Sequence, residues 1–294
     1  MLKRALSVAA VASALGVATE ASAYCRSTTC TGDCARDEFG CKIEGAKLFW
    51  ASGCVGFSLQ KDASIHIPMK YFRQVAEKSF VTWSQIDCGT GLSSLAFSET
   101  EDVGCHQTEY NSAGTNANII MFQDAKWVYI GADNTLAKTT VTYDVDTGEI
   151  FDADIEINHA NNNFTINDDA VDYDLQSVLT HEIGHFMGFD HSDEALATMN
   201  AGYEEGTIDL RTLDPDDEAV ACEVYPPERP VVCDLNPRGG LGYFCGGSHD
   251  PPPTDDGGTD SGGCQLSGAP ASGASVLGPA IAVAAFFLRR RRSR

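Results

Sequence analysis

The sequence predicts an α+β fold, a single domain in which one mixed, twisted β-sheet packs against helices. Three observations lead to this prediction. Short apolar runs with strand character occur at five places between residues 53 and 157. Apolar residues recur at three- and four-residue spacing in two longer segments. A further segment begins with the capping residues of a helix and ends at two prolines.

The first part of the predicted domain contains a helix and three strands. Pro68 opens the helix, because proline is favoured where a helix starts. The core-facing stripe of this helix consists of Phe72, Val75, Ala76, Phe80 and Trp83. The strands are predicted at Gly53–Leu59, Ser94–Ser98 and Asn118–Phe122.

A hairpin is predicted next, with strands at Thr139–Tyr143 and Glu149–Ile157. The segment between them, Asp144-Val-Asp-Thr-Gly148, has a calcium-binding loop as an alternative interpretation. It does not fit the EF-hand pattern, because Gly148 comes one position early and no Glu follows at the required distance. A hairpin turn is therefore favoured.

Two helices complete the predicted domain. The first starts near Asp174, and its inward-facing residues are Val178, Leu179, Ile183 and Phe186. The second has Asp214 as its N-cap and Pro215 at its first position. The negative charges of Asp216 and Asp217 suit the positive N-terminal end of this helix. Pro226-Pro227 is expected to end it.

The most informative stretch is His181-Glu-Ile-Gly-His-Phe-Met-Gly-Phe-Asp-His191. On a helix, His181 and His185 lie one turn apart on the same face and can share a metal ion. Gly188 allows a left-handed turn that delivers His191 as a third ligand. Three neutral imidazoles with one open tetrahedral position are typical of a catalytic zinc site. Glu182 flanks the metal in this arrangement and would act as the general base.

Two other interpretations of this stretch stay open. One is a buried helix whose histidines are merely hydrogen-bonded, and the other is a zinc site that binds metal without turning over. Glu182 argues against the second, because a purely structural site has no need of a base.

The residues after this stretch narrow the interpretation. Met199 follows His191 by eight positions, in Ala197-Thr-Met-Asn-Ala-Gly-Tyr203, and resembles the Met-turn beneath the zinc of metzincin peptidases. With Ser192 and Tyr203, the segment resembles most the matrixin branch, over about residues 50 to 225. The resemblance implies a metzincin-like, zincin-like domain with an active-site helix, a Met-turn and a C-terminal helix.

The resemblance to matrixins also implies where a substrate binds. The segment after Met199 forms one wall of a pocket, so Tyr203 is a candidate pocket residue. Thr139–Tyr143 would be the edge strand beside the cleft, and an exposed edge can hold an extended peptide by main-chain hydrogen bonds. Thr139, Val141 and Tyr143 are therefore further candidates, and the expected substrate is a protein or peptide.

The chain departs from the matrixin pattern in two respects. Matrixins usually carry a propeptide whose cysteine blocks the zinc in a Pro-Arg-Cys-Gly setting, and nothing in the sequence matches it. The mechanism of latency is therefore open. Family members often hold a second, structural zinc through histidines before the motif, and Asp154 occupies one such position. His66, His106 and His159 are interpreted as ordinary surface or loop histidines.

The charge balance constrains the partners. The chain has 294 residues with 20 Lys+Arg against 42 Asp+Glu, and five of the arginines lie within residues 289–294. Such acidity argues against nucleic acid as a partner. It is explained either by solubility or by calcium ligation through some of the Asp and Asn, and the calcium alternative depends mainly on the resemblance to matrixins.

The N-terminus has the pattern of a secretory signal. Lys3 and Arg4 precede the apolar run Ala5–Val17, and Ala21-Ser-Ala23 offers a cleavage site before Tyr24. The mature chain is thus expected in an oxidising compartment. Ten of the eleven cysteines precede a polar linker and Cys264 follows it, which predicts up to five disulfides whose connectivity the sequence does not give.

Six regions follow from these patterns. They are a signal peptide (1–23), a Cys-rich N-terminal segment (24–45), a catalytic domain (46–227), a small Cys-containing extension (228–249), a Pro/Gly/Asp linker (250–263) and a C-terminal tail (264–294). In the tail, Ala269–Leu288 is long enough to cross a bilayer as a helix, with Arg289–Arg292 on the cytoplasmic side. Cys264, the apolar run and the arginines also resemble the C-terminal sorting signal of myxobacterial surface proteins, which implies processing near Cys264.

The sequence therefore predicts a secreted zinc-dependent endopeptidase, monomeric, and released or displayed at a bacterial surface with only its tail in contact with a membrane. The alternative is a surface-displayed metal-binding or adhesion protein with an inactive peptidase fold. A third hypothesis is a zinc hydrolase of another kind, such as an amidase acting on cell-wall material. The edge strand favours a peptide substrate over that third hypothesis.

Overall fold

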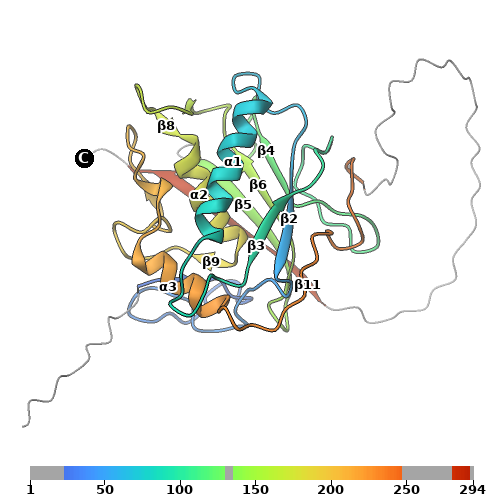
Figure 1. The fold of residues 1–294 in the computed structure, drawn as a ribbon, viewed down its shortest axis with the longest axis vertical. Coiled ribbons are helices and arrows are strands. Elements are labelled where there is room, and N and C mark those ends of the chain that lie inside the picture. Colours follow the sequence, from blue (N-terminus) through green and yellow to red (C-terminus); the bar gives the residue numbers. More distant parts are fainter. Residues whose placement is uncertain (1–22, 130–134, 247–279, 292–294) are drawn as a thin grey trace, which may run out of the picture.

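The computed structural model describes residues 23–129, 135–246 and 280–291. Seven strands form one mixed sheet in the order β10-β11-β5-β6-β4-β2-β3, and helices α1 and α2 cross one face of it (Figure 1). The strands of the sheet are β2 (Cys54–Leu59), β3 (Ala96–Glu99), β4 (Ile119–Phe122), β5 (Thr135–Asp144), β6 (Ile150–Ile157), β10 (Gly202–Tyr203) and β11 (Ile281–Arg290). The mixed sheet with few helices confirms the predicted α+β class.

Within the described ranges, three α-helices and two short ribbons complete the fold. The helices are α1 (Met69–Ser84), α2 (Leu175–Phe186) and α3 (Pro215–Val224), and a short 3₁₀ helix spans Asp209–Arg211. The ribbons pair β1 (Cys25–Arg26) with β9 (Phe189–Asp190) and β7 (Phe164–Thr165) with β8 (Tyr173–Asp174).

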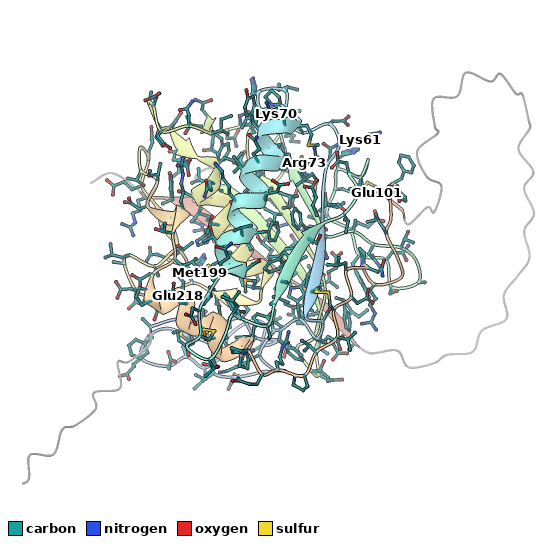
Figure 2. The ribbon with its side chains drawn as sticks, in the orientation of Figure 1. Lys61, Lys70, Arg73, Glu101, Met199 and Glu218 are labelled. Carbon is teal, nitrogen blue, oxygen red and sulfur yellow. A yellow bond between two sulfur atoms is a disulfide. The ribbon has the colours of Figure 1, made fainter. Side chains whose placement is uncertain are left out.

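Helix α1 packs against the sheet and against α2 through the stripe that its spacing predicted. Phe72, Val75, Ala76, Phe80 and Trp83 are all buried. Phe80 stacks on Phe57 of β2, with ring centroids 3.9 Å apart, and the Trp83 indole donates to the Thr180 carbonyl of α2 at 2.7 Å. Outside this stripe, Arg73, which Figure 2 labels, forms ion pairs with Glu99 and Asp102. Trp83 therefore sets the position of α2 relative to α1.

The predicted hairpin is confirmed, since β5 and β6 pair antiparallel across the turn. Gly148 adopts a φ of +80°, which a glycine reaches without steric cost. The Asp144 carboxylate accepts hydrogen bonds from the backbone of Asp146 and Thr147, each at 2.9 Å. These bonds are those of an aspartate-initiated turn, as expected when Asp begins a tight turn.

Both later helices begin at the predicted caps. Asp174 precedes α2 and accepts a hydrogen bond from the Ser177 amide at 2.8 Å. Asp214 caps α3 in a reciprocal capping box with Asp217, and Pro215 is the first residue of that helix. The caps place the starts of α2 and α3 as the sequence indicated.

Ten cysteines form five disulfides, which is the number that the sequence predicted as a maximum. The pairs are Cys25–Cys41, Cys30–Cys34, Cys54–Cys233, Cys88–Cys222 and Cys105–Cys245. Two bonds brace the N-terminal segment, and two tie the extension after α3 to the sheet side of the domain. Cys264 lies outside the described residues, as do the linker and most of the signal segment.

The apolar tail segment differs from its prediction. Residues 281–290 form the strand β11 instead of part of a spanning helix, and residues 269–279 of the predicted span lie outside the described residues. Within the ranges that the structure describes, no helix is both long enough and apolar enough to cross a membrane. The physical reason is that β5 offers a row of main-chain partners, and the segment contains β-branched and aromatic residues that favour a strand.

The expectation that Thr139–Tyr143 forms an exposed edge is therefore wrong. Strand β5 lies between β6 and β11, and all ten of its residues are buried. β11 covers it along almost its whole length, from the pair Ile281 and Asp144 to the pair Arg289 and Thr135. A segment distant in sequence has taken the place at which a peptide was expected.

Candidate active site

Helix α2 and the turn after it bring three histidines together. Nε2 of His185 lies 3.1 Å from Nε2 of His181 and 3.2 Å from Nε2 of His191. Tetrahedral zinc with Zn–N bonds of about 2.0–2.1 Å needs ligand nitrogens about 3.3 Å apart. Both measured distances are close to the separation that one such ion requires, and the ligand atoms of all three histidines lie within 4.8 Å of one another.

The opposite ring nitrogens fix the imidazole tautomers. Nδ1 of His181 lies 2.6 Å from the Thr198 carbonyl, and Nδ1 of His185 lies 2.8 Å from the Phe189 carbonyl. A carbonyl only accepts, so each Nδ1 carries the proton and each Nε2 keeps its lone pair for a metal. The chemistry of this donor set fits a zinc ion.

Burial keeps these imidazoles neutral. It lowers the pKa of His181 to about 3 and the pKa of His185 well below its usual range, and neighbouring imidazoles add to both effects. Burial also lowers the pKa of His191. Since a metal competes with protons for the same lone pairs, neutral imidazoles favour metal binding at neutral pH.

Gly188 makes the geometry of the third histidine accessible. Its φ is +94°, and a Cβ at this position would lie 2.9 Å from the Leu48 carbonyl oxygen. Its amide closes the end of α2 by donating to the His185 carbonyl at 2.9 Å. The chain then turns into β9, and His191 comes back to the other two histidines, as its spacing predicted.

Glu182 lies on α2 beside the histidines with its side chain fully buried. The Thr139 hydroxyl of β5 donates to Oε2 of Glu182, and the Leu288 amide of β11 donates to Oε1 at 3.3 Å. Burial is the main cause that raises the pKa of Glu182 to about 8. A carboxyl with a pKa near neutrality can both take up and release a proton, which suits a general base.

The residues named as pocket candidates divide into different environments. Thr139 reaches the site through its hydroxyl, whereas Val141 and Tyr143 pack in the main hydrophobic core. Tyr203 is 1% exposed, and its hydroxyl accepts from the Asp174 amide and donates to the Thr207 carbonyl. The structure therefore brings only Thr139 of these four to Glu182.

Met199, labelled in Figure 2, is buried and lies against Gly184 of the histidine helix, which is the place that a Met-turn occupies. The contact depends on Gly184, because a Cβ there would lie 2.1 Å from the Met199 sulfur. The sequence reasoning missed this role of Gly184, although the residue stands inside the motif. The signal available was a glycine in the middle of a helix, where it is unfavourable without a packing reason.

Asp217 is a second residue whose role was missed. Its buried carboxylate accepts from the amides of Thr198, Met199 and Asp214, at 2.7, 3.0 and 2.9 Å. The sequence identified it only as an acidic residue in the first turn of α3. By holding both sides of the Met-turn, Asp217 also fixes the carbonyl of Thr198 that orients His181.

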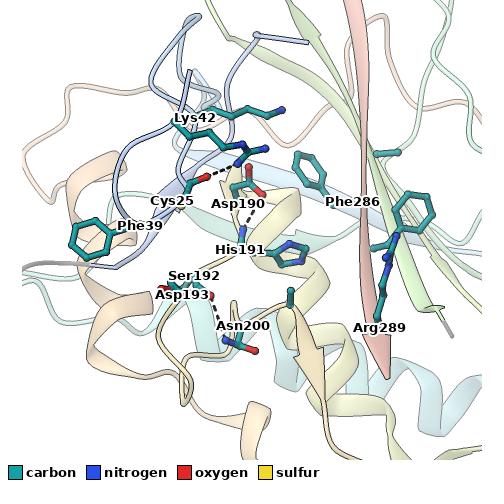
Figure 3. Close-up of a pocket in the computed structure, with 15 residues that line it drawn as sticks. Cys25, Phe39, Lys42, Asp190, His191, Ser192, Asp193, Asn200, Phe286 and Arg289 are labelled. Carbon is teal, nitrogen blue, oxygen red and sulfur yellow. Dashed lines mark hydrogen bonds between the residues drawn. The ribbon is translucent and has the colours of Figure 1, made fainter. Parts of the chain in front are cut away.

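A pocket of about 600 Å³ opens next to His191 (Figure 3). The N-terminal segment lines one side through Arg36, Phe39 and Lys42, and β11 lines another through Phe286 and Arg289. Figure 3 shows Phe286 on the side of β11 that faces His191. The Phe286 ring stacks on His185, with centroids 4.5 Å apart and planes 15° from parallel.

Other candidate ligands are already engaged. Asp154 is buried and accepts from the amides of Ile119 and Glu109, at 2.9 and 3.0 Å. His159 lies 2.8 Å from an Asp124 oxygen through Nδ1, and His66 packs against the ring of His159. In the described part of the chain, the further ligand clusters each contain cysteines that are joined in disulfides.

A model of the matrixin family matches residues 49–226, which is more than half of the 294-residue chain. The chain therefore belongs to the matrixin family. Membership implies a zinc-dependent metallopeptidase of the hydrolase class, which acts on protein or peptide substrates. A comparison with curated proteins finds no match. The five disulfides are typical of extracellular proteins.

Proposed function

We propose that this protein is a secreted zinc endopeptidase in which His181, His185 and His191 hold the metal and Glu182 is the general base. The observation that carries the proposal is the convergence of three histidine ring nitrogens beside one buried carboxylate. A structural zinc site would have no use for that carboxylate. The inactive-fold alternative has no damaged residue at this site to support it.

The residues divide the chemistry among them. Zinc, when bound, would polarise the scissile carbonyl and lower the pKa of the attacking water. Glu182 takes the proton of the attacking water and returns it to the leaving amine. The Thr139 hydroxyl holds Oε2 of Glu182, so that Oε1 faces the cleft where β11 now donates to it. The carbonyls of Thr198 and Phe189 keep two imidazoles in the metal-binding tautomer.

The site also supports a binding mode for the substrate. An extended peptide beside β5 would receive main-chain hydrogen bonds without regard to its sequence, and its side chains would meet the histidine helix on one face. In β11, the side chains that contact the site are the apolar Phe286 and Leu288. We therefore expect this face to accept apolar side chains of a substrate. A single chain holds all of these residues, so we propose a monomer.

The localisation is part of the same proposal. The signal pattern of residues 1–23 and five disulfides support secretion. We propose that residues 264–294 are a sorting signal and that processing near Cys264 releases the protein or displays it at the surface. Mass spectrometry of the protein recovered from its native cell tests this, and an intact arginine-rich C-terminus on the mature protein would contradict it.

The test of the catalytic assignment is Glu182→Gln, with Glu77→Gln on the exposed face of α1 as the matched control. We expect Glu182→Gln to keep one zinc per chain and to lose cleavage of casein and of a quenched peptide. Each variant is measured in the natural chain and in a Leu288→Asp background. In that background a charge replaces the buried Leu288 side chain and weakens the packing of β11 beside β5, where the substrate would bind. Cleavage that persists in Glu182→Gln and Leu288→Asp combined would refute the assigned role.

A further inference from the structure

The substrate cleft has an occupant. β11 pairs antiparallel with β5 and, on its other side, parallel with β10. Two main-chain hydrogen bonds join the C-terminal end of the β11 segment to the residues that follow Met199. The Arg289 amide donates to the Ala201 carbonyl at 3.4 Å, and the Arg291 amide donates to the Tyr203 carbonyl at 2.9 Å. β11 is therefore held from both sides in the extended form in which a peptide would enter by strand addition.

β11 also contacts the groups to which we assign the reaction. The Leu288 amide lies 3.3 Å from Oε1 of Glu182, and the Leu288 side chain is fully buried. Phe286, two residues earlier, covers the ring of His185. A second extended peptide cannot reach Glu182 or His185 along β5 while these two side chains are in place.

Polar contacts hold the end of the strand. The Arg291 guanidinium donates to the Asn200 side-chain oxygen at 3.0 Å, and to the Ala195 carbonyl at 3.4 Å. Arg289 lines the pocket that also contains Asp190 and Asp193. Arg289 and Arg291 thus lie against the cleft of a strongly acidic chain. The negative charge of the chain attracts these arginines, which gives β11 an advantage over a neutral peptide in binding to the cleft.

We propose that residues 281–291 are the resident ligand of the cleft, an intramolecular strand that competes with substrate and must leave β5 before a peptide is cleaved. The inference rests on the proposed function for its consequence, inhibition, but not for the binding itself. Because the strand belongs to the same chain, its effective concentration is high, and modest intrinsic affinity is enough to close the cleft. Cleavage of the chain between residues 247 and 279 would convert the strand into a separable ligand and open the site.

Binding is tested first, without zinc. A site for a sequence-specific protease is inserted within residues 250–263 of the full chain, the folded protein is cut, and the C-terminal fragment is removed by gel filtration in the presence of a chelator. A labelled peptide of residues 280–291 is then added, and its fluorescence anisotropy is followed. We expect saturable binding, weakened at least about tenfold by Leu288→Asp in the peptide, which corresponds to the loss of one buried anchor.

The matched control peptide carries Val283→Asp. It has the same change from an apolar to an acidic residue, but Val283 is 58% exposed, so we expect its affinity to stay within about twofold of the parent peptide. Absence of saturable binding, or equal affinity of the Leu288→Asp peptide and the parent peptide, would overturn the proposal.

The second test uses the uncut chain. Leu288→Asp should speed hydrogen exchange of the β5 amides and raise kcat/KM for a quenched peptide at least about tenfold. Val232→Asp, at an exposed position in the extension after α3, should do neither. If β5 exchanges faster and the peptide binds but no cleavage appears, the proposed function fails while the strand remains the ligand. Unchanged exchange and unchanged kcat/KM in a folded Leu288→Asp chain would overturn the inference.

Discussion

The histidine stretch and β11 meet at one cleft, but the chain specifies them in opposite ways. All three histidines and Glu182 lie within eleven consecutive residues, and helix geometry with one glycine turn brings them together. β11 reaches the same place only by pairing with β5, whose residues are more than 130 positions earlier in the chain. Local periodicity encodes the first region, whereas the second depends on the main-chain partners that a distant strand leaves open.

The difference predicts that the histidine site fails through single side chains. His185→Ala should lose stoichiometric zinc, and cleavage should fall by about 10³-fold or more, because two remaining imidazoles cannot hold the ion in its geometry. Metal analysis and a peptide assay in the Leu288→Asp background measure both effects. His66→Ala, which removes an exposed histidine outside the site, is the control. Tight zinc binding by His185→Ala would show that another residue completes the site.

The second prediction concerns pH and the metal-free protein. Burial raises the pKa of Glu182 to about 8 from its ordinary value of 4.5, so the folded chain keeps a proton there that the unfolded chain loses between these values. The stability that this protonated carboxyl contributes is full below pH 4.5 and is lost as pH rises through about 8. Glu182→Gln removes the dependence. Its stability advantage over the natural chain should grow by on the order of a few kcal/mol from pH 5 to pH 8.

Chemical denaturation of both proteins in chelator, at pH 5 and at pH 8, checks this. Burial lowers the pKa of His181 to about 3, so that histidine destabilises the fold as pH falls below 6.5. Both proteins contain His181, so comparing them at each pH cancels its contribution. A stability advantage of Glu182→Gln that shrinks toward pH 8 would contradict the buried, protonated state of Glu182.

The third prediction tests the contact beneath the histidine helix. Gly184→Ala places a Cβ 2.1 Å from the Met199 sulfur, and the resulting overpacking should destabilise the fold by about 1–3 kcal/mol. Adding Met199→Ala removes the atom with which that Cβ collides. Denaturation of the two single variants and the double variant gives their coupling. Strictly additive losses would show that Gly184 does not make room for Met199.

Much of the histidine site and its frame could be predicted from the sequence, because the signals are short in range. The stripe of α1, the caps at Asp174 and Asp214, and the turn at Gly188 each depend on residues only a few positions apart. The hairpin of β5 and β6 belongs to the same class, since its turn residues define the pairing.

The features that could not be predicted from the sequence depend on contacts between residues that are distant in the chain. Asp217 was recognised at the start of a helix, but its bonds to Thr198 and Met199 exist only once α3 has packed against the Met-turn. The five disulfide pairings likewise follow from the folded distances between cysteines. The apolar run before Arg289 has the composition of a membrane helix as well as that of a buried strand, and only the open side of β5 distinguishes them.

The smallest predicted effect separates the ionic part of β11 from its buried part. Arg291 is exposed and donates to Asn200 and Ala195, so its charge is screened by salt, unlike the buried Leu288 contact. Arg291→Gln should therefore raise kcat/KM for a quenched peptide only about two- to threefold at low salt, and the difference should vanish near 0.5 M salt. Arg238→Gln, on the far side of the sheet against Phe151, serves as the control. An effect of Arg291→Gln that survives high salt would mean that its geometry, and not its charge, holds β11 in the cleft.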